Sequence, residues 1–170
     1  MSSSDIQQQF DRLNEQVAKL KQQGRYGEAV GIAEQMVKLS LIYAGVEHPH
    51  YADCLQNLAG LYVAMGNYDD AEPYLCQALE IYGQALGEED PHFTTTLNNL
   101  AALYEAMGNY DDAEPLYRQA LEIRRHALGE LHPDFAASLN NLADLYELMG
   151  NHTAAGTLYW QAQMIAESEE

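Results

Sequence analysis

A period of 42 residues organises this sequence more strongly than any other feature. Residues 49–90 and 91–132 are identical at 27 of 42 aligned positions. Self-similarity at a fixed spacing of this length is typical of solenoids, in which each unit buries its apolar faces against its neighbours. We therefore expect one solenoid domain over residues 1–170, with repeats at about 5–48, 49–90, 91–132 and 133–170.

Each period contains two helical patterns. In the third period, Leu97, Leu100, Ala101 and Tyr104 have the spacing of one helix face. Gly108 then interrupts the pattern, and glycine suits the left-handed position just after a helix. A second apolar stripe follows and ends near Leu128-Gly129, before a proline that suits the start of a helix. We predict an all-α fold with eight helices, at about 5–23, 27–44, 50–65, 69–86, 92–107, 111–128, 134–149 and 153–167.

Two prolines fall inside predicted second helices. Proline is well tolerated only in the first turn of a helix, because its ring removes a hydrogen bond and clashes with the preceding turn. Pro73 and Pro115 therefore predict either a late start, near Asp70 and Asp112, or a distorted first turn.

Small and large residues alternate along the period in a way that suits stacked helices. Alanine recurs on the first helices at 59, 101 and 143 and on the second helices at 71, 113 and 155, and tyrosine recurs at 62, 104 and 146. Stacking such pairs side by side buries their faces in a continuous core. The expected product is a right-handed superhelical solenoid whose first helices line a concave face.

Composition excludes several classes of function. Lys and Arg number 8 against 26 Asp and Glu, which gives a formal charge of −18 and argues against binding to nucleic acid or anionic membranes. No apolar run approaches a membrane span, and the N-terminus lacks the pattern of a secretory signal. We interpret Cys54 and Cys76 as free thiols in a reducing compartment, which predicts a cytoplasmic protein.

The repeat resembles that of the tetratricopeptide repeat family over nearly the whole chain. The common family repeat has 34 residues. The 42-residue period, with Leu-Asn-Asn-Leu-Ala and Leu-Gly-x-x-His-Pro, resembles the kinesin light chain type. The family pattern maps onto Leu100, Ala101, Tyr104, Ala113, Tyr117 and Ala120, and again onto Leu142, Ala143, Tyr146, Ala155, Tyr159 and Ala162. The first repeat departs most, with Gln16 in the place of Leu58 and Ala33 in the place of Tyr117, so we interpret it as a degenerate N-terminal cap.

The resemblance implies a peptide or a partner helix bound on the concave face. The first-helix positions expected there carry no Lys or Arg in repeats two to four, so we do not carry over the clamp for a terminal carboxylate. Side-chain amides recur instead, and an amide can both donate to and accept from a peptide backbone. The carboxylates nearby favour a neutral or basic segment. The predicted groove residues are Gln56, Asn57, Asn98, Asn99, Glu105, Asn140, Asn141, Asp144 and Glu147.

The amides also have a structural interpretation, in which they only join neighbouring helices. For Asn57, Asn99 and Asn141 both readings stay open, whereas Asn98 and Asn140 favour ligand contact because Gln56 breaks their pattern.

The last helix carries apolar residues and no further predicted helix to cover them. Trp160, Met164 and Ile165 form a possible interface with a partner or a second copy of the chain, unless Trp160 folds back over its own repeat.

The sequence shows no catalytic constellation, no metal site and no motif for a cofactor. The histidines of successive repeat junctions lie on separate loops, too far apart to converge on one ion. His48 and His50 share one junction, but Pro49 separates them in a turn that opens a helix. We therefore expect a non-enzymatic scaffold that binds a protein or peptide. The alternative is a module that self-assembles through its terminal helices.

Overall fold

The computed structural model describes residues 3–167, with side chains from residue 5 to residue 167. These residues form eight α-helices joined by short connections, without a strand in the part described. The helices are α1 (Ser3–Gln22), α2 (Tyr26–Tyr43), α3 (Pro49–Ala64), α4 (Tyr68–Ala85), α5 (Pro91–Ala106), α6 (Tyr110–Leu128), α7 (Pro133–Leu148) and α8 (His152–Glu167). The all-α solenoid predicted from the period is confirmed.

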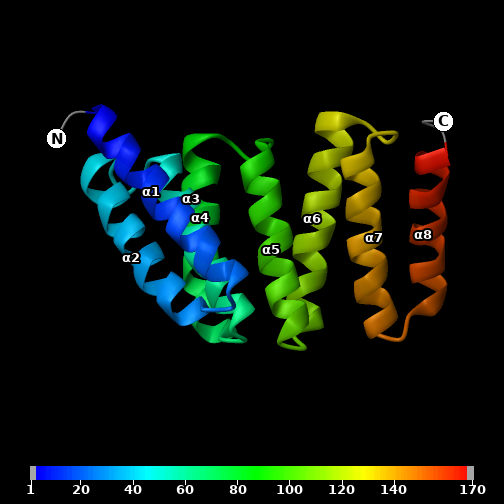
Figure 1. Cartoon of the computed structure of the whole chain (residues 1–170). Coiled ribbons are helices and arrows are strands. Elements are labelled where there is room, and N and C mark those ends of the chain that lie inside the picture. The colour runs from blue at the N-terminus through cyan, green and yellow to red at the C-terminus, as the bar shows by residue number, and fades with distance from the viewer. Residues whose placement is uncertain (1–2, 168–170) are drawn as a thin grey trace. The chain divides into compact units, whose positions relative to one another are not determined.

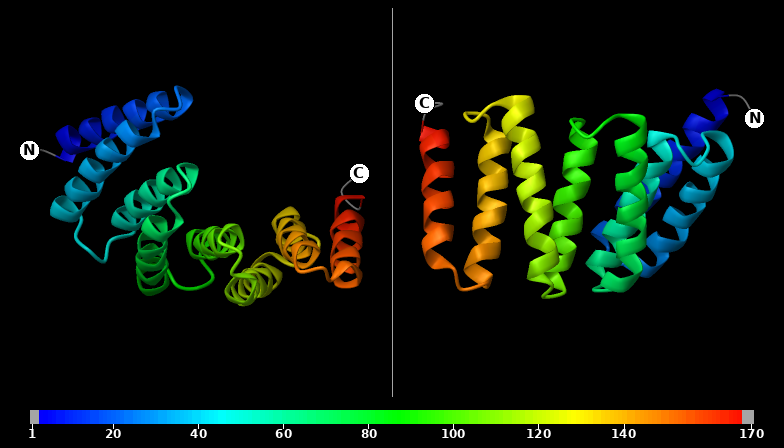
Figure 2. Two further views of the ribbon diagram at one scale, coloured as in Figure 1. Left: turned by 90° about the horizontal axis from the view of Figure 1, so that it is seen from below. Right: turned by 180° about the vertical axis from the view of Figure 1, so that it is seen from behind.

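The helices group into two compact units, each of which holds two repeats. The N-terminal unit, Met1–Ala85, contains α1 to α4, and the C-terminal unit, Leu86–Glu170, contains α5 to α8. Within each unit every helix packs on the next one in sequence, and neighbours run antiparallel (Figures 1 and 2). The four repeat boundaries and the single domain expected over residues 1–170 stay predictions.

Proline and a side-chain cap together fix the start of each first helix after the N-terminal one. Pro49, Pro91 and Pro133 are the first residues of α3, α5 and α7, where the missing N–H needs no partner. The residue before each proline accepts a hydrogen bond from the backbone N–H two positions later. The acceptors are His48 Nδ1 at 3.1 Å, Asp90 Oδ1 at 2.8 Å and His132 Nδ1 at 3.1 Å. Two of the six histidines thus cap helices.

A left-handed glycine ends each first helix. Gly66, Gly108 and Gly150 have φ of 76°, 79° and 78°, a conformation that costs other residues about 1 kcal/mol or more. The chain then turns directly into the next helix. Consequently α4 and α6 begin at Tyr68 and Tyr110 and keep Pro73 and Pro115 inside them, so the late start near Asp70 and Asp112 is wrong.

The small residues of the period lie in the core of each unit. Ala59 and Ala71 in the N-terminal unit are fully buried, as are Ala101, Ala113, Ala143 and Ala155 in the C-terminal unit. Because a methyl group occupies little space, the neighbouring helix can approach closely at these points. The first repeat also packs as a true helix pair, since Phe10 of α1 is buried beside Met36 and Cys54.

Candidate functional site

The N-terminal unit contains a groove of about 360 Å³ between α1 and α3, with α2 beneath it. Asn14, Val17, Ala18 and Lys21 of α1 form one side, and Cys54 and Asn57 of α3 contribute to the other. Ala33 and Met36 of α2 lie at the bottom. The predicted groove residue Asn57 therefore lines an actual cavity, while Gln56 beside it is half-buried.

The position of Ala33 explains much of this space. The same position of the period carries Leu75 in α4, Tyr117 in α6 and Tyr159 in α8. An alanine has a smaller side chain than a leucine or a tyrosine, so it leaves more space at this position. The departure of the first repeat from the family pattern thus coincides with the groove, although we interpreted it above only as degeneration of a cap.

The chemistry of the groove is largely apolar with a few polar groups. Burial raises the pKa of the Cys54 thiol, a hydrogen bond with Ser40 lowers it, and the charge of Asp53 raises it. The polar residues of its lining are Asn14, Lys21, Gln22 and Asn57. Apolar walls with a small number of polar groups are the usual composition of a binding cleft.

The α1 side of this groove lies outside the residues predicted from the sequence. Asn14 lies one period before Gln56, Ala18 one period before Gly60, and Lys21 one period before Val63. Extending the predicted positions back by 42 residues would therefore have found all three. It would also have found a lysine where repeats three and four carry Glu105 and Glu147.

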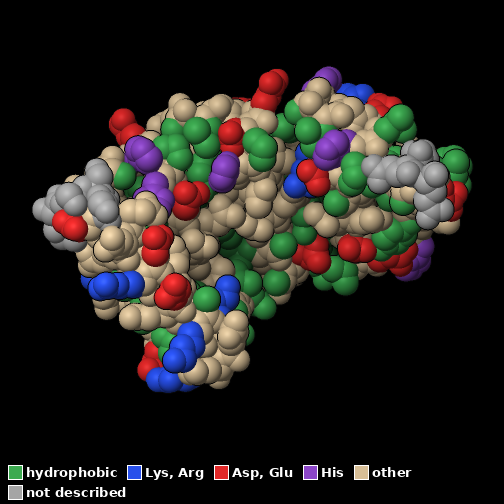
Figure 3. Space-filling model, turned by 45° about the horizontal axis from the view of Figure 1, so that its top comes forward, with side chains coloured by type: hydrophobic (Ala, Val, Ile, Leu, Met, Phe, Trp, Pro, Cys, Tyr) green, Lys and Arg blue, Asp and Glu red, His purple; other side chains and the backbone are tan. Residues whose placement is uncertain are grey.

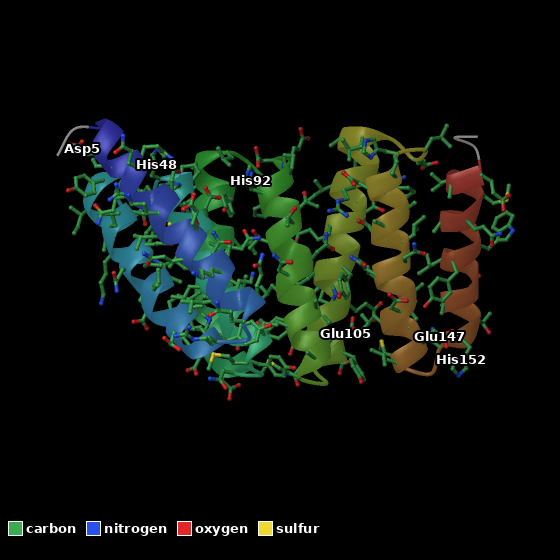
Figure 4. The ribbon with its side chains drawn as sticks, in the orientation of Figure 1. Asp5, His48, His92, Glu105, Glu147 and His152 are labelled. Carbon is green, nitrogen blue, oxygen red and sulfur yellow. The ribbon has the colours of Figure 1, made fainter. Side chains whose placement is uncertain are left out.

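Basic side chains are unevenly distributed between the two units. Five of the eight Lys and Arg residues precede residue 86, and Figure 3 shows several of them over the N-terminal helices. The C-terminal unit instead presents carboxylates on its first helices. Glu105 and Glu147 lie toward the C-terminal ends of α5 and α7, and His92 lies at the opposite end of α5 (Figure 4).

Tyrosine hydroxyls donate hydrogen bonds to two carboxylates on the first helices of the C-terminal unit, those of Glu105 and Asp144. Tyr117 Oη donates to Glu105 Oε2 at 3.1 Å, and Tyr159 Oη donates to Asp144 Oδ1 at 2.5 Å. Burial, together with the charge of Asp144, raises the pKa of Glu105, while the bond from Tyr117 lowers it. The hydrogen bond to Asp144 raises the pKa of Tyr159 to about 12.

Glu147 has a different partner. Its Oε2 lies 2.7 Å from His152 Nδ1, where α7 gives way to α8 (Figure 4). The three predicted carboxylates of the C-terminal unit are therefore all positioned by neighbouring side chains.

The predicted asparagines differ in their exposure. Asn57, Asn99 and Asn140 are exposed, whereas Asn98 and Asn141 are half-buried. Across residues 5–167 the structure shows no side-chain hydrogen bond for any of the five, and Asn98 Oδ1 is buried without a partner there. These amides thus do not tie helices together within the described part of the chain.

The apolar residues of the last helix separate onto two faces. Trp160 and Met164, one turn apart, are 62% and 48% exposed. Ile165 is buried against Phe135, Leu139 and Ala162, because it lies on the inward side of α8. The exposed surface predicted for this helix therefore includes Trp160 and Met164 but not Ile165.

In the described residues, no helix is both long enough and apolar enough to pass through a bilayer. Between residues 3 and 167, no three His, Cys, Asp or Glu side chains come together as a set of metal ligands.

Comparison with known proteins identifies the repeats. A family model described as tetratricopeptide repeat matches residues 14–84 and 93–168, and a second model of the same description matches 57–127. Repeats of this kind generally mediate protein–protein interaction or scaffolding, and their fold is typically non-enzymatic. No curated protein matches this chain.

Solved structures with the same fold cover most of the chain. The crystal structure of BtubC (BKLC) from P. vanneervenii has a TM-score of 0.81 at 26% identity, over 90% of this chain and 61% of that one. This chain thus spans less than two thirds of that protein. A putative kinesin light chain with nearly identical repeats, from Podosopora anserina, has a TM-score of 0.53 at 23% identity over 94% and 96% of the two chains. The present chain belongs to the tetratricopeptide repeat family, and its repeats are similar in fold to those of the putative kinesin light chain structure.

Proposed function

We propose that this protein is a non-enzymatic interaction module that holds an extended segment of a partner protein against its first helices. The observation that carries the proposal is the groove of about 360 Å³ between α1 and α3. A cavity of this size accepts one large apolar side chain of a bound segment. Asn57 at its edge offers donors and an acceptor for the segment's backbone.

The carboxylates of the C-terminal unit support a preference for neutral or basic sequence. Glu105, Asp144 and Glu147 lie at first-helix positions of the period. Their negative potential attracts Lys or Arg in a ligand and is screened by salt. Two free cysteines fit a reducing compartment such as the cytoplasm.

A groove-filling substitution tests the main proposal. The full chain is first used to select binders from a peptide array, and their affinities are measured by fluorescence anisotropy. Ala18→Trp places a large ring in the groove from an exposed position of α1 and should weaken the selected peptides at least tenfold. Gln16→Trp, on the same helix but outside the groove, is the matched control and should leave affinity unchanged. Equal effects of the two variants, or an array without binders, would contradict the proposal.

Self-assembly through the terminal helix is the second candidate, favoured by the exposed Trp160 and Met164. Patches of this kind often mark interfaces. Sedimentation equilibrium should then show an oligomer that Trp160→Glu converts to a monomer. A wild-type chain that is monomeric at high micromolar concentration would exclude this candidate.

A further inference from the structure

A second, smaller cavity lies in the C-terminal unit and contains an arginine. It has a volume of about 110 Å³ and lies where the start of α5 meets the end of α6 and the start of α7. This is several times the 10–15 Å³ that a single water needs, so the end of one polar side chain fits. Its lining includes Glu89, Thr95, Ile123, Arg124, Ala127 and Asp134.

The guanidinium group of Arg124 is only partly satisfied by the protein. Its Nη1 donates to the Asp134 carbonyl oxygen at 3.1 Å and to Ser138 Oγ at 2.9 Å. An arginine has five N–H donors, so those on Nε and Nη2 are left for other acceptors. Within residues 5–167 no carboxylate oxygen lies within 4 Å of this group, although the charge of Asp134 reaches it from farther away.

The preceding repeat shows what the same positions look like when they are filled. One period before Arg124 and Thr95 are Tyr82 and Asp53. Tyr82 Oη donates to Asp53 Oδ1 at 2.5 Å, so the donor on the second helix meets a carboxylate on the first. In the third repeat the donor is a cation and the carboxylate has been replaced by the neutral Thr95. The pocket therefore has a strong donor and lacks the acceptor that its counterpart contains.

We propose that the Arg124–Thr95 pocket binds a carboxylate of the partner segment, in the place that Asp53 occupies one repeat earlier. This inference rests on the proposed function, because Thr95 lies on the same stripe of α5 as Asn98, Asn99 and Glu105. Arginine and a hydroxyl are well suited to a carboxylate, to which they donate charge-assisted hydrogen bonds.

The pocket also gives the bound segment a direction. Thr95 and Glu105 are ten residues apart on α5, about 15 Å at the helical rise of 1.5 Å per residue. A segment that follows this helix thus places its carboxylate near the N-terminal end of α5. A Lys or Arg four or five residues away would lie near Glu105, since an extended chain spans about 3.3 Å per residue.

Two carboxylates oppose this binding and supply a further test. Glu89 and Asp134 line the same pocket, so their charges weaken its attraction for an anion. Glu89→Gln should therefore tighten the binding of a carboxylate, whereas a pocket that holds a cation would lose affinity.

The experiment uses small probes, so that it does not depend on finding a peptide. The full chain, labelled with ¹⁵N, is titrated with N-acetyl-aspartate N-methylamide while the Arg124 Nε–H resonance is followed by NMR. N-acetyl-asparagine N-methylamide is the neutral control, and N-acetylglycine represents a chain-terminal carboxylate. We expect a saturable shift with the aspartyl probe and none with the asparaginyl probe. A saturable shift with N-acetylglycine alone would assign the pocket to a chain end.

Substitutions at Thr95 give a matched pair. Thr95→Asp restores the arrangement of the preceding repeat and should weaken the carboxylate probe at least tenfold, because the pocket then holds its own acceptor. Thr95→Asn is similar in size but neutral and should retain binding. Thr95 is exposed, so both variants should fold. Equal shifts with the acidic and neutral probes, or equal effects of the two variants, would overturn the proposal.

Peptides separate this proposal from the proposed function. For peptides selected on the array, replacing Asp or Glu by its amide should weaken binding to the wild-type chain but not to Thr95→Asp. If no peptide binds while the aspartyl probe does, the groove function fails and the carboxylate pocket survives. A different outcome is that peptides bind while Thr95→Asp changes neither the effect of their acidic residues on affinity nor the NMR shift caused by the probes. In that case the pocket proposal fails and the proposed groove function stands.

Discussion

Tyr117 on α6 donates a hydrogen bond of 3.1 Å to Glu105 on α5, and so joins the two helices of the third repeat at the end of the predicted binding stripe. The tyrosine is a core residue, at 4% exposure, whereas the carboxylate is half-buried. One residue of the family pattern thus has two roles. Its ring fills the core, and its hydroxyl orients a carboxylate that faces the ligand side.

The first prediction concerns the pKa of Glu105. Burial raises this pKa and the hydrogen bond from Tyr117 lowers it, so Tyr117→Phe should raise it further. The change is measured from the side-chain carboxyl ¹³C shift as a function of pH. Tyr110→Phe, in the same helix, is the control and should leave the pKa of Glu105 where it is. An unchanged pKa in Tyr117→Phe would show that the hydroxyl does not stabilise the carboxylate.

The second prediction concerns stability at acid pH. The hydrogen bond from Arg118, followed by that from Tyr146, lowers the pKa of Glu114 in the folded chain. A carboxylate of this kind stabilises the fold above its unfolded pKa, and this stability is lost as pH falls through the folded pKa. Glu114→Gln should therefore reduce the free energy of unfolding at pH 7 by up to about 1 kcal/mol, since the exposed side chain of Arg118 lets solvent screen the pair. Below both pKa values the difference should vanish.

Urea unfolding of the full chain at pH 7, and at a pH below the folded and unfolded pKa values of Glu114, checks this prediction. Glu15→Gln, an exposed position of α1, serves as the control for a general change of charge. A Glu114→Gln effect that is the same at both pH values would exclude ionisation as its cause.

The third prediction concerns the close approach of helices. Ala143 of α7 is fully buried, and Ala137 of the same helix is exposed. Ala143→Leu should destabilise the chain by about 1–3 kcal/mol, because extra methyl groups have no space in a packed core. Ala137→Leu should change stability by less than about 0.5 kcal/mol. Thermal unfolding followed by circular dichroism measures both, and similar melting temperatures for the two variants would contradict the packing described here.

The fourth prediction uses two glycines with opposite backbone requirements. Gly108 has φ of 79°, whereas Gly156 lies within α8 and has open space around the position of a Cβ. Gly108→Ala should destabilise by about 1 kcal/mol, because an L-residue is strained there. Gly156→Ala should stabilise by about 0.5–1 kcal/mol, because alanine favours a helix interior. Effects of the same sign in urea unfolding would refute the assigned helix ends.

The period alone was sufficient to place the helices. The spacing of apolar residues follows from the 3.6-residue turn of the helix. Gly108 ends a helix through its positive φ, and Pro133 begins one because its missing N–H needs no partner there. Each helix boundary is therefore decided by a few neighbouring residues. The prolines inside α4 and α6 were harder to place. The turn after Gly66 or Gly108 fixes the helix start, and its influence outweighs that of Pro73 or Pro115.

The period predicts only part of the candidate functional site. The period predicts Asn57 in a groove, but the pattern of the first repeat, which is typical of a degenerate cap, does not predict the opposite wall on α1. The same departure from the pattern, Ala33 in place of tyrosine, leaves the space that makes the groove. A period identifies equivalent positions, and it does not show how much volume three helices leave between them.

The sequence by itself therefore determined the repeat, the helices and the family, because these follow from local backbone preferences and a recurring pattern of small and large residues. Only the tertiary structure decided which surfaces are open. The packing of the helices buries Ile165 and leaves Trp160 exposed. It also places Arg124 and Thr95 in one pocket, where no carboxylate oxygen of residues 5–167 lies within 4 Å of the guanidinium group. The burial of a side chain and the lining of a pocket depend on side chains from several helices at once. These side chains come together only when the helices pack against one another.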